Sequence, residues 1–343
     1  MYKYNIPKQI AKRCIQFIAS KLGPHTRKPK TPQLLVLMYH RILPLNDTRS
    51  DTEEPGMIVT PDTFREHLKI LEDYFEFTTS SQWIEHKDNN QLEPTKYCAI
   101  TFDDGWLDNY EFAYPILKEM KIPATIYIVA DKIGTNETFW PERLSSLVKT
   151  ICNDAPQHWS ISSTQWIRDL SENFNLNNTM PSKDEMAAII DRAKKLTDKE
   201  INSRLDKIEI ELNLKPNKSP SLLTWEQVVE MSDSNLIEIG SHTCTHTRLD
   251  NKASSNLLHD EIVKSKVIIE AKINRPVTTF CFPNGDFTKE ALDLVRDNYI
   301  GSVTTKKGWN SQQSDEFLLQ RVGMHEDVSN SKIAFLSRIA GWI

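Results

Sequence analysis

The sequence predicts an α/β protein in which parallel strands alternate with helices that lie on their outside. Short apolar runs rich in β-branched and aromatic residues, typical of buried strands, occur at residues 34–39, 97–102, 124–130, 236–242, 278–283, 299–305 and 317–323. Amphipathic stretches with helical spacing separate most of these runs, at residues 61–74, 109–120, 224–234, 256–273 and 288–298. Such alternation favours parallel strands joined by outer helices.

The composition excludes several other classes of protein. The chain has 343 residues, of which 39% are hydrophobic and 26% charged, as in ordinary folded proteins. Its net charge of −5 argues against a general nucleic-acid-binding surface, so we expect no nucleic-acid partner. The five cysteines include no C-x-x-C pair, so we expect neither a disulfide framework nor a thiolate zinc site, and a reducing compartment fits best.

Residues 1–30 are predicted to form a separate basic segment with an amphipathic helix over residues 7–22. No acidic residue precedes Asp47, so this part of the chain is positively charged throughout. Two interpretations stay open: peripheral contact with an anionic membrane surface, or docking of the helix on the protein's own domain. No apolar run approaches the ~18 residues of a spanning helix, and no signal-peptide pattern is present.

The strand–helix rhythm stops between residues 131 and 221, which we interpret as a helical insertion. Residues 182–213 within it have the pattern of two charged amphipathic helices, and prolines punctuate the segment. The predicted main domain is therefore made of residues 31–130 and 222–343.

Two segments that carry chemistry follow predicted strands. Asp103 and Asp104 come directly after one strand, at the end where parallel folds build their sites. Adjacent carboxylates repel unless something compensates, so they indicate a metal ligand beside a general base, or else a turn in which one aspartate caps a helix.

His242 and His246 follow another strand, four residues apart, which is metal-ligand spacing. Solvated or helix-capping histidines are the alternative. One aspartate and two histidines together would make a three-ligand site with an open position for water.

Three further residues are candidates for substrate contact. Tyr39 and His40 close the first strand, where we expect a polar pair to point into the site, or to be satisfied in the core. Trp106 follows the aspartate pair and could stack on a sugar face or cover the rim of the domain.

The sequence TFDDG at 101–105, together with the pattern H-[ST]-x-x-H-[ST] at 242–247, resembles the polysaccharide deacetylases of carbohydrate esterase family 4, the NodB-homology domain. The segments VLMYHRI at 36–42, FCFPNGDF at 280–287 and FWPERL at 139–144 add to it. The resemblance covers roughly residues 34–328. It implies a distorted (β/α)7 barrel, here with the helical insertion and the N-terminal amphipathic helix.

The resemblance also implies a role for each residue of the two motifs. Asp103 would be the general base, and Asp104, His242 and His246 would bind one divalent metal. Zinc suits two imidazoles and a carboxylate, although cobalt, nickel or iron would fit the same ligands.

Two more roles come from the same resemblance. The backbone N–H of Asn284 would help to hold the oxyanion, and His325 would protonate the leaving amine, the alternative being a loop histidine without a catalytic role. One feature departs from the family, because the arginine that often precedes the third-motif proline is absent and Cys281 and Phe282 stand there.

We therefore predict a metal-dependent hydrolase that removes an N-acyl group, most simply acetyl, from an amino sugar of a surface polysaccharide or its precursor. The alternatives are a deformylase or O-deacetylase of a lipid-linked sugar, and an inactive carbohydrate-binding protein on the same fold. We expect a cytoplasmic protein whose substrate is an N-acylated glycan or a lipid- or nucleotide-linked precursor. If residues 7–22 contact a membrane rather than the protein's own domain, we expect that contact at the inner face.

Overall fold

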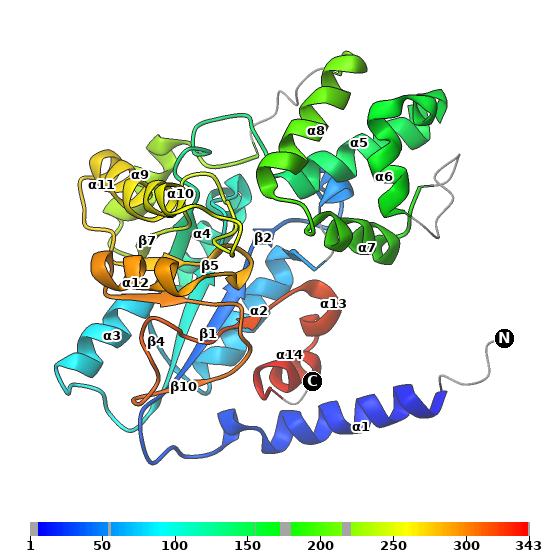
Figure 1. The fold of residues 1–343 in the computed structure, drawn as a ribbon. Helices are drawn as coiled ribbons and strands as arrows, with labels where there is room; N and C mark the ends of the chain where they lie inside the picture. The colour runs from blue at the N-terminus through cyan, green and yellow to red at the C-terminus, as the bar shows by residue number, and fades with distance from the viewer. Residues whose placement is uncertain (1–5, 54–55, 155, 172–179, 215–220, 342–343) are drawn as a thin grey trace.

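A ring of mainly parallel strands forms the centre of the molecule, with helices outside it, in a computed structural model that describes residues 6–53, 56–154, 156–171, 180–214 and 221–341 (Figure 1). The strands are β1 (Gln33–Tyr39), β2 (Arg41–Ile42), β3 (Ile58–Val59), β4 (Glu76–Thr78), β5 (Lys96–Phe102), β6 (Ala124–Ile128), β7 (Ile237–Ser241), β8 (Thr279–Cys281), β9 (Gly301–Val303), β10 (Asn310–Ser311) and β11 (Val322–Gly323). The predicted α/β class with a distorted barrel is confirmed.

The helices of the main body are α1 (Ile6–Leu22), α2 (Pro61–Glu72), α3 (Ser80–Asp88), α4 (Tyr114–Met120), α9 (Trp225–Asp233), α10 (Ser255–His259), α11 (Ser265–Ile273), α12 (Lys289–Asn298), α13 (Glu326–Ser329) and α14 (Lys332–Ile339). Those of the insertion are α5 (Trp140–Asp154), α6 (Gln165–Leu170), α7 (Lys183–Ala193) and α8 (Asp198–Glu211). Local sequence starts many of them, since Thr60, Thr79, Ser182, Thr197 and Thr224 each accept a hydrogen bond from the first turn that follows.

The sheet closes on itself through its last strand. The order is β10-β1-β5-β6-β7-β8-β9, and every neighbouring pair from β1 to β9 is parallel. The segment from Leu319 to Gly323 then bridges the gap, because Leu319 pairs with Val303 of β9 and β11 pairs in parallel with β1. The predicted strand at 317–323 thus forms a continuous ladder only over Val322–Gly323, which is why the barrel is distorted.

The two faces of each strand enter different apolar clusters, as the two-residue period of a strand requires. In β1, Leu35, Leu37 and Tyr39 pack with the outer helices, whereas Leu34 and Val36 belong to a cluster inside the ring. In β5, Cys98, Ile100 and Phe102 face outward, and Tyr97 and Ala99 face inward. By the same alternation, Met38 and Thr101 face inward, and so do His40 and Asp103, the first residues beyond the carboxyl ends of β1 and β5.

The helical insertion has an apolar core of its own. Leu144, Val148, Ile189, Ile201 and Leu205 are fully buried members of a cluster drawn from α5, α7 and α8, separate from the core of the barrel. In Figure 1 these helices stand above the carboxyl ends of the barrel strands. The predicted domain boundaries at 131 and 221 stay predictions.

Helix α1 packs beneath the opposite end of the barrel, against α14 (Figure 1). Among the described residues, no helix is long and apolar enough to cross a membrane. All five cysteines fall in the described ranges, and each is a free thiol.

Candidate active site

Three strand ends place the predicted site residues at one edge of the barrel. Asp103 and Asp104 follow β5, His242 follows β7, and Cys281 ends β8. The carboxyl ends of parallel strands meet at the same edge of the sheet, and all four residues are buried there. The site is therefore built on the most rigid part of the fold.

Asp104, His242 and His246 converge on one point. The Asp104 Oδ1 atom lies 3.4 Å from His242 Nε2 and 3.3 Å from His246 Nε2. Two ligands that are each 2.0–2.1 Å from a tetrahedral zinc ion lie about 3.3 Å apart. The three side chains thus have the chemistry and the spacing that a divalent metal of this kind requires.

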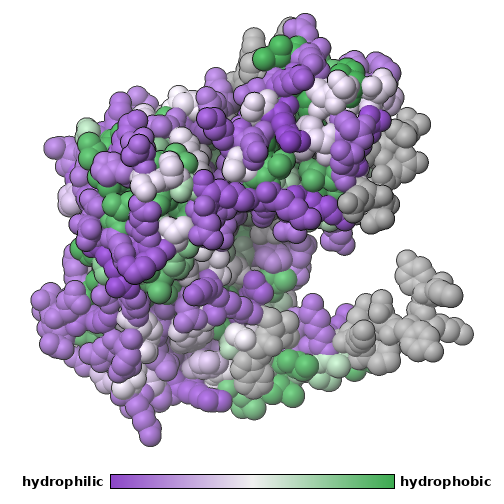
Figure 2. All heavy atoms as spheres, in the orientation of Figure 1, coloured by the Kyte–Doolittle hydropathy of each residue, from purple (hydrophilic) through white to green (hydrophobic). Residues whose placement is uncertain are grey.

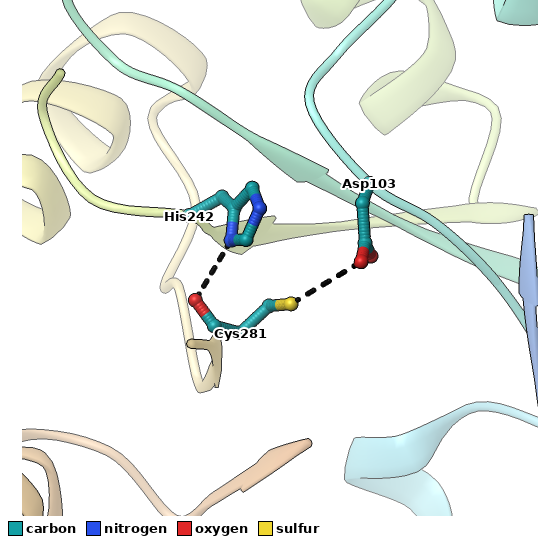
Figure 3. Close-up of side chains that lie close together, drawn as sticks. All are labelled: Asp103, His242 and Cys281. Carbon is teal, nitrogen blue, oxygen red and sulfur yellow. Dashed lines mark hydrogen bonds between the residues drawn. The ribbon is translucent and has the colours of Figure 1, made fainter. Parts of the chain in front are cut away.

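Hydrogen bonds outside the triad fix the direction of its ligands. The Nδ1 atom of His242 contacts the Cys281 carbonyl at 2.8 Å (Figure 3), so Nδ1 carries the proton and Nε2 keeps its lone pair for the metal. The indole Nε1 of Trp106 donates to Asp104 Oδ2 at 2.9 Å, which leaves Oδ1 facing the histidines.

The backbone of the site is held in conformations that residues other than glycine rarely adopt. Asp104, Thr243 and His246 have φ values of 76°, 70° and 67°, and for a β-branched residue such as Thr243 this conformation is strained. The carboxylate of Glu261, which is buried, accepts hydrogen bonds from the backbone N–H groups of Cys244 and Thr245 and so holds the loop in place.

Asp103 is fixed by an arginine that sequence reasoning missed. The Arg321 guanidinium donates to both Asp103 carboxylate oxygens, at 2.7 and 2.8 Å, from the segment that closes the barrel. It also donates to the Thr304 carbonyl. Burial works to raise the pKa of Asp103, but Arg321 more than offsets it, and the net effect lowers the pKa. Asp103 is therefore an oriented carboxylate at neutral pH.

Cys281 explains how an arginine can reach Asp103 from a distant strand. The thiol Sγ lies 3.5 Å from Asp103 Oδ2 and 3.2 Å from an Arg321 nitrogen. The small cysteine leaves room beside Asp103, and Arg321 reaches the carboxylate from the segment that closes the ring. The only sequence signal was Arg321 itself, a charged residue in an otherwise apolar strand pattern.

Asp103, His242 and Cys281 also lie close enough together to hold an ion (Figure 3). Burial raises the pKa of the Cys281 thiol well above its usual value, and Arg321 already neutralises Asp103. This second group is therefore a poor metal site compared with the triad around Asp104.

The next predicted residues to place are His40, His325 and Asn284. His40 lies on the inner side of the barrel, with Nε2 3.8 Å from Asp103 Oδ2. His325 follows β11, which pairs with β1, so it lies on the same rim as His40. Burial and the nearby Arg338 lower the pKa of His325. Asn284 is exposed after β8 in a tight turn with φ of 55°.

The structure does not expose Tyr39 or Trp106 to a substrate, and the burial of Trp106 fits its alternative role as a covering side chain. Tyr39 is fully buried on the outer side of β1, where its hydroxyl bonds to His67 Nδ1 at 3.1 Å. It cannot point into the site together with His40, because neighbouring residues of a strand face opposite sides. Trp106 is only 1% exposed and packs against Phe139, so it supports Asp104 and has no free face for a sugar.

The insertion is tied to the loop that carries His246. Arg248 is buried, its backbone N–H and its Nε atom both donate to Asp198 at the start of α8, and its terminal nitrogens donate to the carbonyls of Lys194 and Leu196. Beside this clamp is a cavity of about 420 Å³, lined by His246 and Thr247 on one side and Asp198, Lys199 and Asn202 on the other.

The fold and this geometry together define the class of the protein. A family model described as polysaccharide deacetylase matches residues 90–300, which is more than half of the chain. The chain therefore belongs to the polysaccharide deacetylase family.

Two relatives show a local match in sequence. YxkH of Bacillus subtilis (strain 168) is 32% identical over 125 residues, which are 36% of this chain and 41% of that protein. The poly-beta-1,6-N-acetyl-D-glucosamine N-deacetylase of Staphylococcus aureus is 32% identical over 120 residues, 33% of this chain and 41% of that protein. The matches thus span about two fifths of the length of these curated relatives.

Two solved structures share the fold over most of the chain. The Streptococcus pyogenes deacetylase PplD, solved in complex with acetate, superposes with a TM-score of 0.57 at 20% identity, covering 90% of this chain and 98% of that one. IcaB from Ammonifex degensii superposes with a TM-score of 0.56 at 18% identity, covering 90% of this chain and 100% of that one.

Proposed function

We propose that this protein is a metal-dependent N-deacetylase that removes acetyl groups from the amino sugars of an N-acetylated polysaccharide. The convergence of Asp104, His242 and His246 beside the fixed carboxylate of Asp103 carries the proposal. A polymer of N-acetylglucosamine is the substrate we favour, because the matching Staphylococcus aureus relative is named for that polymer. This intact set of residues favours an enzyme over an inactive carbohydrate-binding protein.

Asp104, His242 and His246 are the residues that would hold the metal. The metal, when bound, polarises the acyl carbonyl and makes water more acidic. A neutral His242 is needed for this role, and its Nδ1–H bond to the Cys281 carbonyl fixes the required tautomer. Trp106 keeps Asp104 turned toward the two histidines.

Asp103 takes the proton from the attacking water in this mechanism. Its pKa is lowered, so it is ready as a base across the neutral range. The two-pronged contact with Arg321 prevents the carboxylate from rotating and supplies the compensating charge that burial requires. The backbone N–H of Asn284 helps to hold the negative charge that develops on the carbonyl oxygen.

An acid must protonate the amine as the carbon–nitrogen bond breaks. We assign this role to His325, which would donate the proton from its imidazolium form; its lowered pKa favours giving that proton to the amine. His40 is the second candidate, because it is on the same rim and within 3.8 Å of Asp103. The acid is the residue whose replacement by alanine removes the alkaline limb of the kcat profile.

The central experiment measures metal content and acyl release on the same preparations. Oligomers of N-acetylglucosamine should yield equal amounts of acetate and free amine with the zinc-loaded protein. Asp103→Asn should keep about one metal per chain and lose about 10²–10⁴ of kcat, whereas His242→Ala with His246→Ala should lose both metal and activity.

Other acyl groups separate the proposal from its alternatives. If N-acetyl oligomers release nothing, release of formate from N-formyl sugars would show a deformylase instead. Release of acetate from O-acetyl sugars would show an O-deacetylase. Oligomer binding by the metal-loaded protein without release of any acid would show a binding protein. A lipid- or nucleotide-linked precursor as substrate, and a cytoplasmic location, stay predictions.

A further inference from the structure

Helix α1 docks on the protein through its least apolar face. Ala19 and Ser20 are buried where α1 packs on α14. Gly23 follows in the same close approach, since a Cβ atom at this position would lie 2.7 Å from the Cβ of Ala340. Small residues thus form the contact with the body, and the opposite side of the helix turns toward solvent.

The exposed side of α1 is apolar along its length. Five large apolar side chains of α1 are between 45% and 58% exposed, namely those of Ile10, Ile15, Phe17, Ile18 and Leu22. Figure 2 shows the apolar residues gathered along the lower edge of the molecule, over α1. A surface helix ordinarily buries such a face against its own core, so this face is built to be covered by something else.

The charged residues of α1 and of the segment that follows it are all basic. Lys12, Arg13 and Lys21 on the helix, and Arg27 and Lys28 just after it, are exposed. No acidic residue occurs before Asp47 in the chain. An apolar face bordered by lysine and arginine suits a layer that has acyl chains inside and anionic groups at its surface.

We infer that α1 lies in the surface of an anionic lipid membrane, with Phe17 and Ile18 among the headgroups and acyl chains. The same charges argue against a second copy of this chain as the occupant. A symmetric dimer would bring the same patch of each copy face to face, and these patches are both basic and contain no acidic residue to pair with.

This docking sets the orientation of the active site. The chain after α1 lies at the amino ends of the strands, since the Lys96 ammonium at the start of β5 donates to the His25 carbonyl. Asp103 lies at the other end of the same strand, and a strand of seven residues is about 20 Å long. The catalytic edge thus faces away from the lipid surface (Figure 1).

Vesicle sedimentation of the full chain tests the inference. The wild type should sediment with vesicles of phosphatidylcholine containing about one third phosphatidylglycerol, and not with pure phosphatidylcholine. Phe17→Ser with Ile18→Ser should weaken binding at least tenfold. A matched control is Ile210→Ser with Val267→Ser, which replaces two apolar side chains of similar exposure on other surfaces and should bind as the wild type does.

A second pair of measurements distinguishes the contribution of charge from that of apolar contact, and binding to lipid from binding to a second protein chain. Arg27→Glu with Lys28→Glu should abolish binding at low salt, and 0.5 M salt should weaken the wild type. Circular dichroism should be unchanged in all variants, because every altered side chain is exposed. Equal sedimentation of the Phe17 and Ile18 variant and the control would overturn the inference, as would a wild-type dimer that this variant dissociates.

Discussion

Among the described residues, Arg321 is the only arginine in contact with the Asp103 carboxylate, and the cost of Arg321→Met follows from the contacts of its guanidinium. Arg321 is fully buried and the Asp103 side chain is 4% exposed. Hydrogen bonds to charged groups contribute about 1.5–3 kcal/mol each, and breaking a buried ion pair costs about 3–5 kcal/mol. We therefore expect the free energy of unfolding at pH 7.5 to fall by about 3–5 kcal/mol.

The pH dependence of this loss gives a sharper test. The folded-state pKa of Asp103 is lowered, so its contribution to stability is present above the unfolded-state pKa of about 3.9 and is lost as the pH falls through the folded-state value. Without Arg321, burial raises the pKa of Asp103 instead. The variant then becomes protonated at higher pH, and the difference in stability from the wild type should narrow on acidification toward pH 4.

Urea unfolding followed by tryptophan fluorescence measures the difference at each pH. Arg296→Met is the matched control, because Arg296 pairs with Asp315 on the surface, with both side chains more than a third exposed; it should cost about 0–1 kcal/mol. Asp103→Asn combined with Arg321→Met should recover part of the loss. A loss for Arg321→Met below about 1 kcal/mol, or a loss that is constant with pH, would refute the reasoning.

Three other predictions concern the metal site. Zinc at a hundred times its dissociation constant should stabilise the wild type by about 2.7 kcal/mol, seen as a rise in Tm that EDTA reverses, and should not stabilise His242→Ala with His246→Ala. Trp106→Phe removes the donor to Asp104 Oδ2 and should weaken zinc binding about 10–100-fold in competition with a chelating dye, while an unchanged affinity would deny the indole this role. Glu261→Gln replaces the charged acceptor that holds the loop before His246 and should weaken zinc binding by about tenfold. The loss of kcat should be greater than the loss of fold stability. Equal losses of both would make Glu261 a purely structural residue.

The alternation of strands and helices and the place of the two motifs could be predicted because their signals are local. A buried run followed directly by Asp103 and Asp104 places both carboxylates at a strand end, whatever the rest of the chain does. The spacing of His242 and His246 acts in the same way. Each motif lies next to the strand that positions it, so adjacency was sufficient to place it, whereas the roles of its residues came from the resemblance to the deacetylase family.

Other parts of the site depend on which side of a strand a residue faces. The error at Tyr39 came from treating it and His40 as one polar pair, although the two-residue period sends them to opposite faces. Which of its two roles Trp106 fills could not be predicted, because the backbone turns sharply through Asp104 and Gly105, both at positive φ, and carries the indole back under the site.

Arg321 could not be assigned to Asp103 from sequence because the segment that carries it makes few regular strand pairs. Only Val322–Gly323 pairs regularly with β1, so the run from 317 to 323 gave no register, and a register is needed to say which side chains enter the barrel. A contact across more than 200 residues leaves no local pattern in a single sequence.

The closure of the barrel by residues 319–323 also sets the order in which the site can form during translation. A nascent chain contains all three residues of the metal triad, and Asp103, long before the ribosome reaches Arg321. Until that codon is read and the last strand joins β1, the carboxylate of Asp103 has no charge to balance it in the barrel interior. The balanced carboxylate is thus acquired together with the seal of the barrel, and a chain that stops before residue 319 has neither.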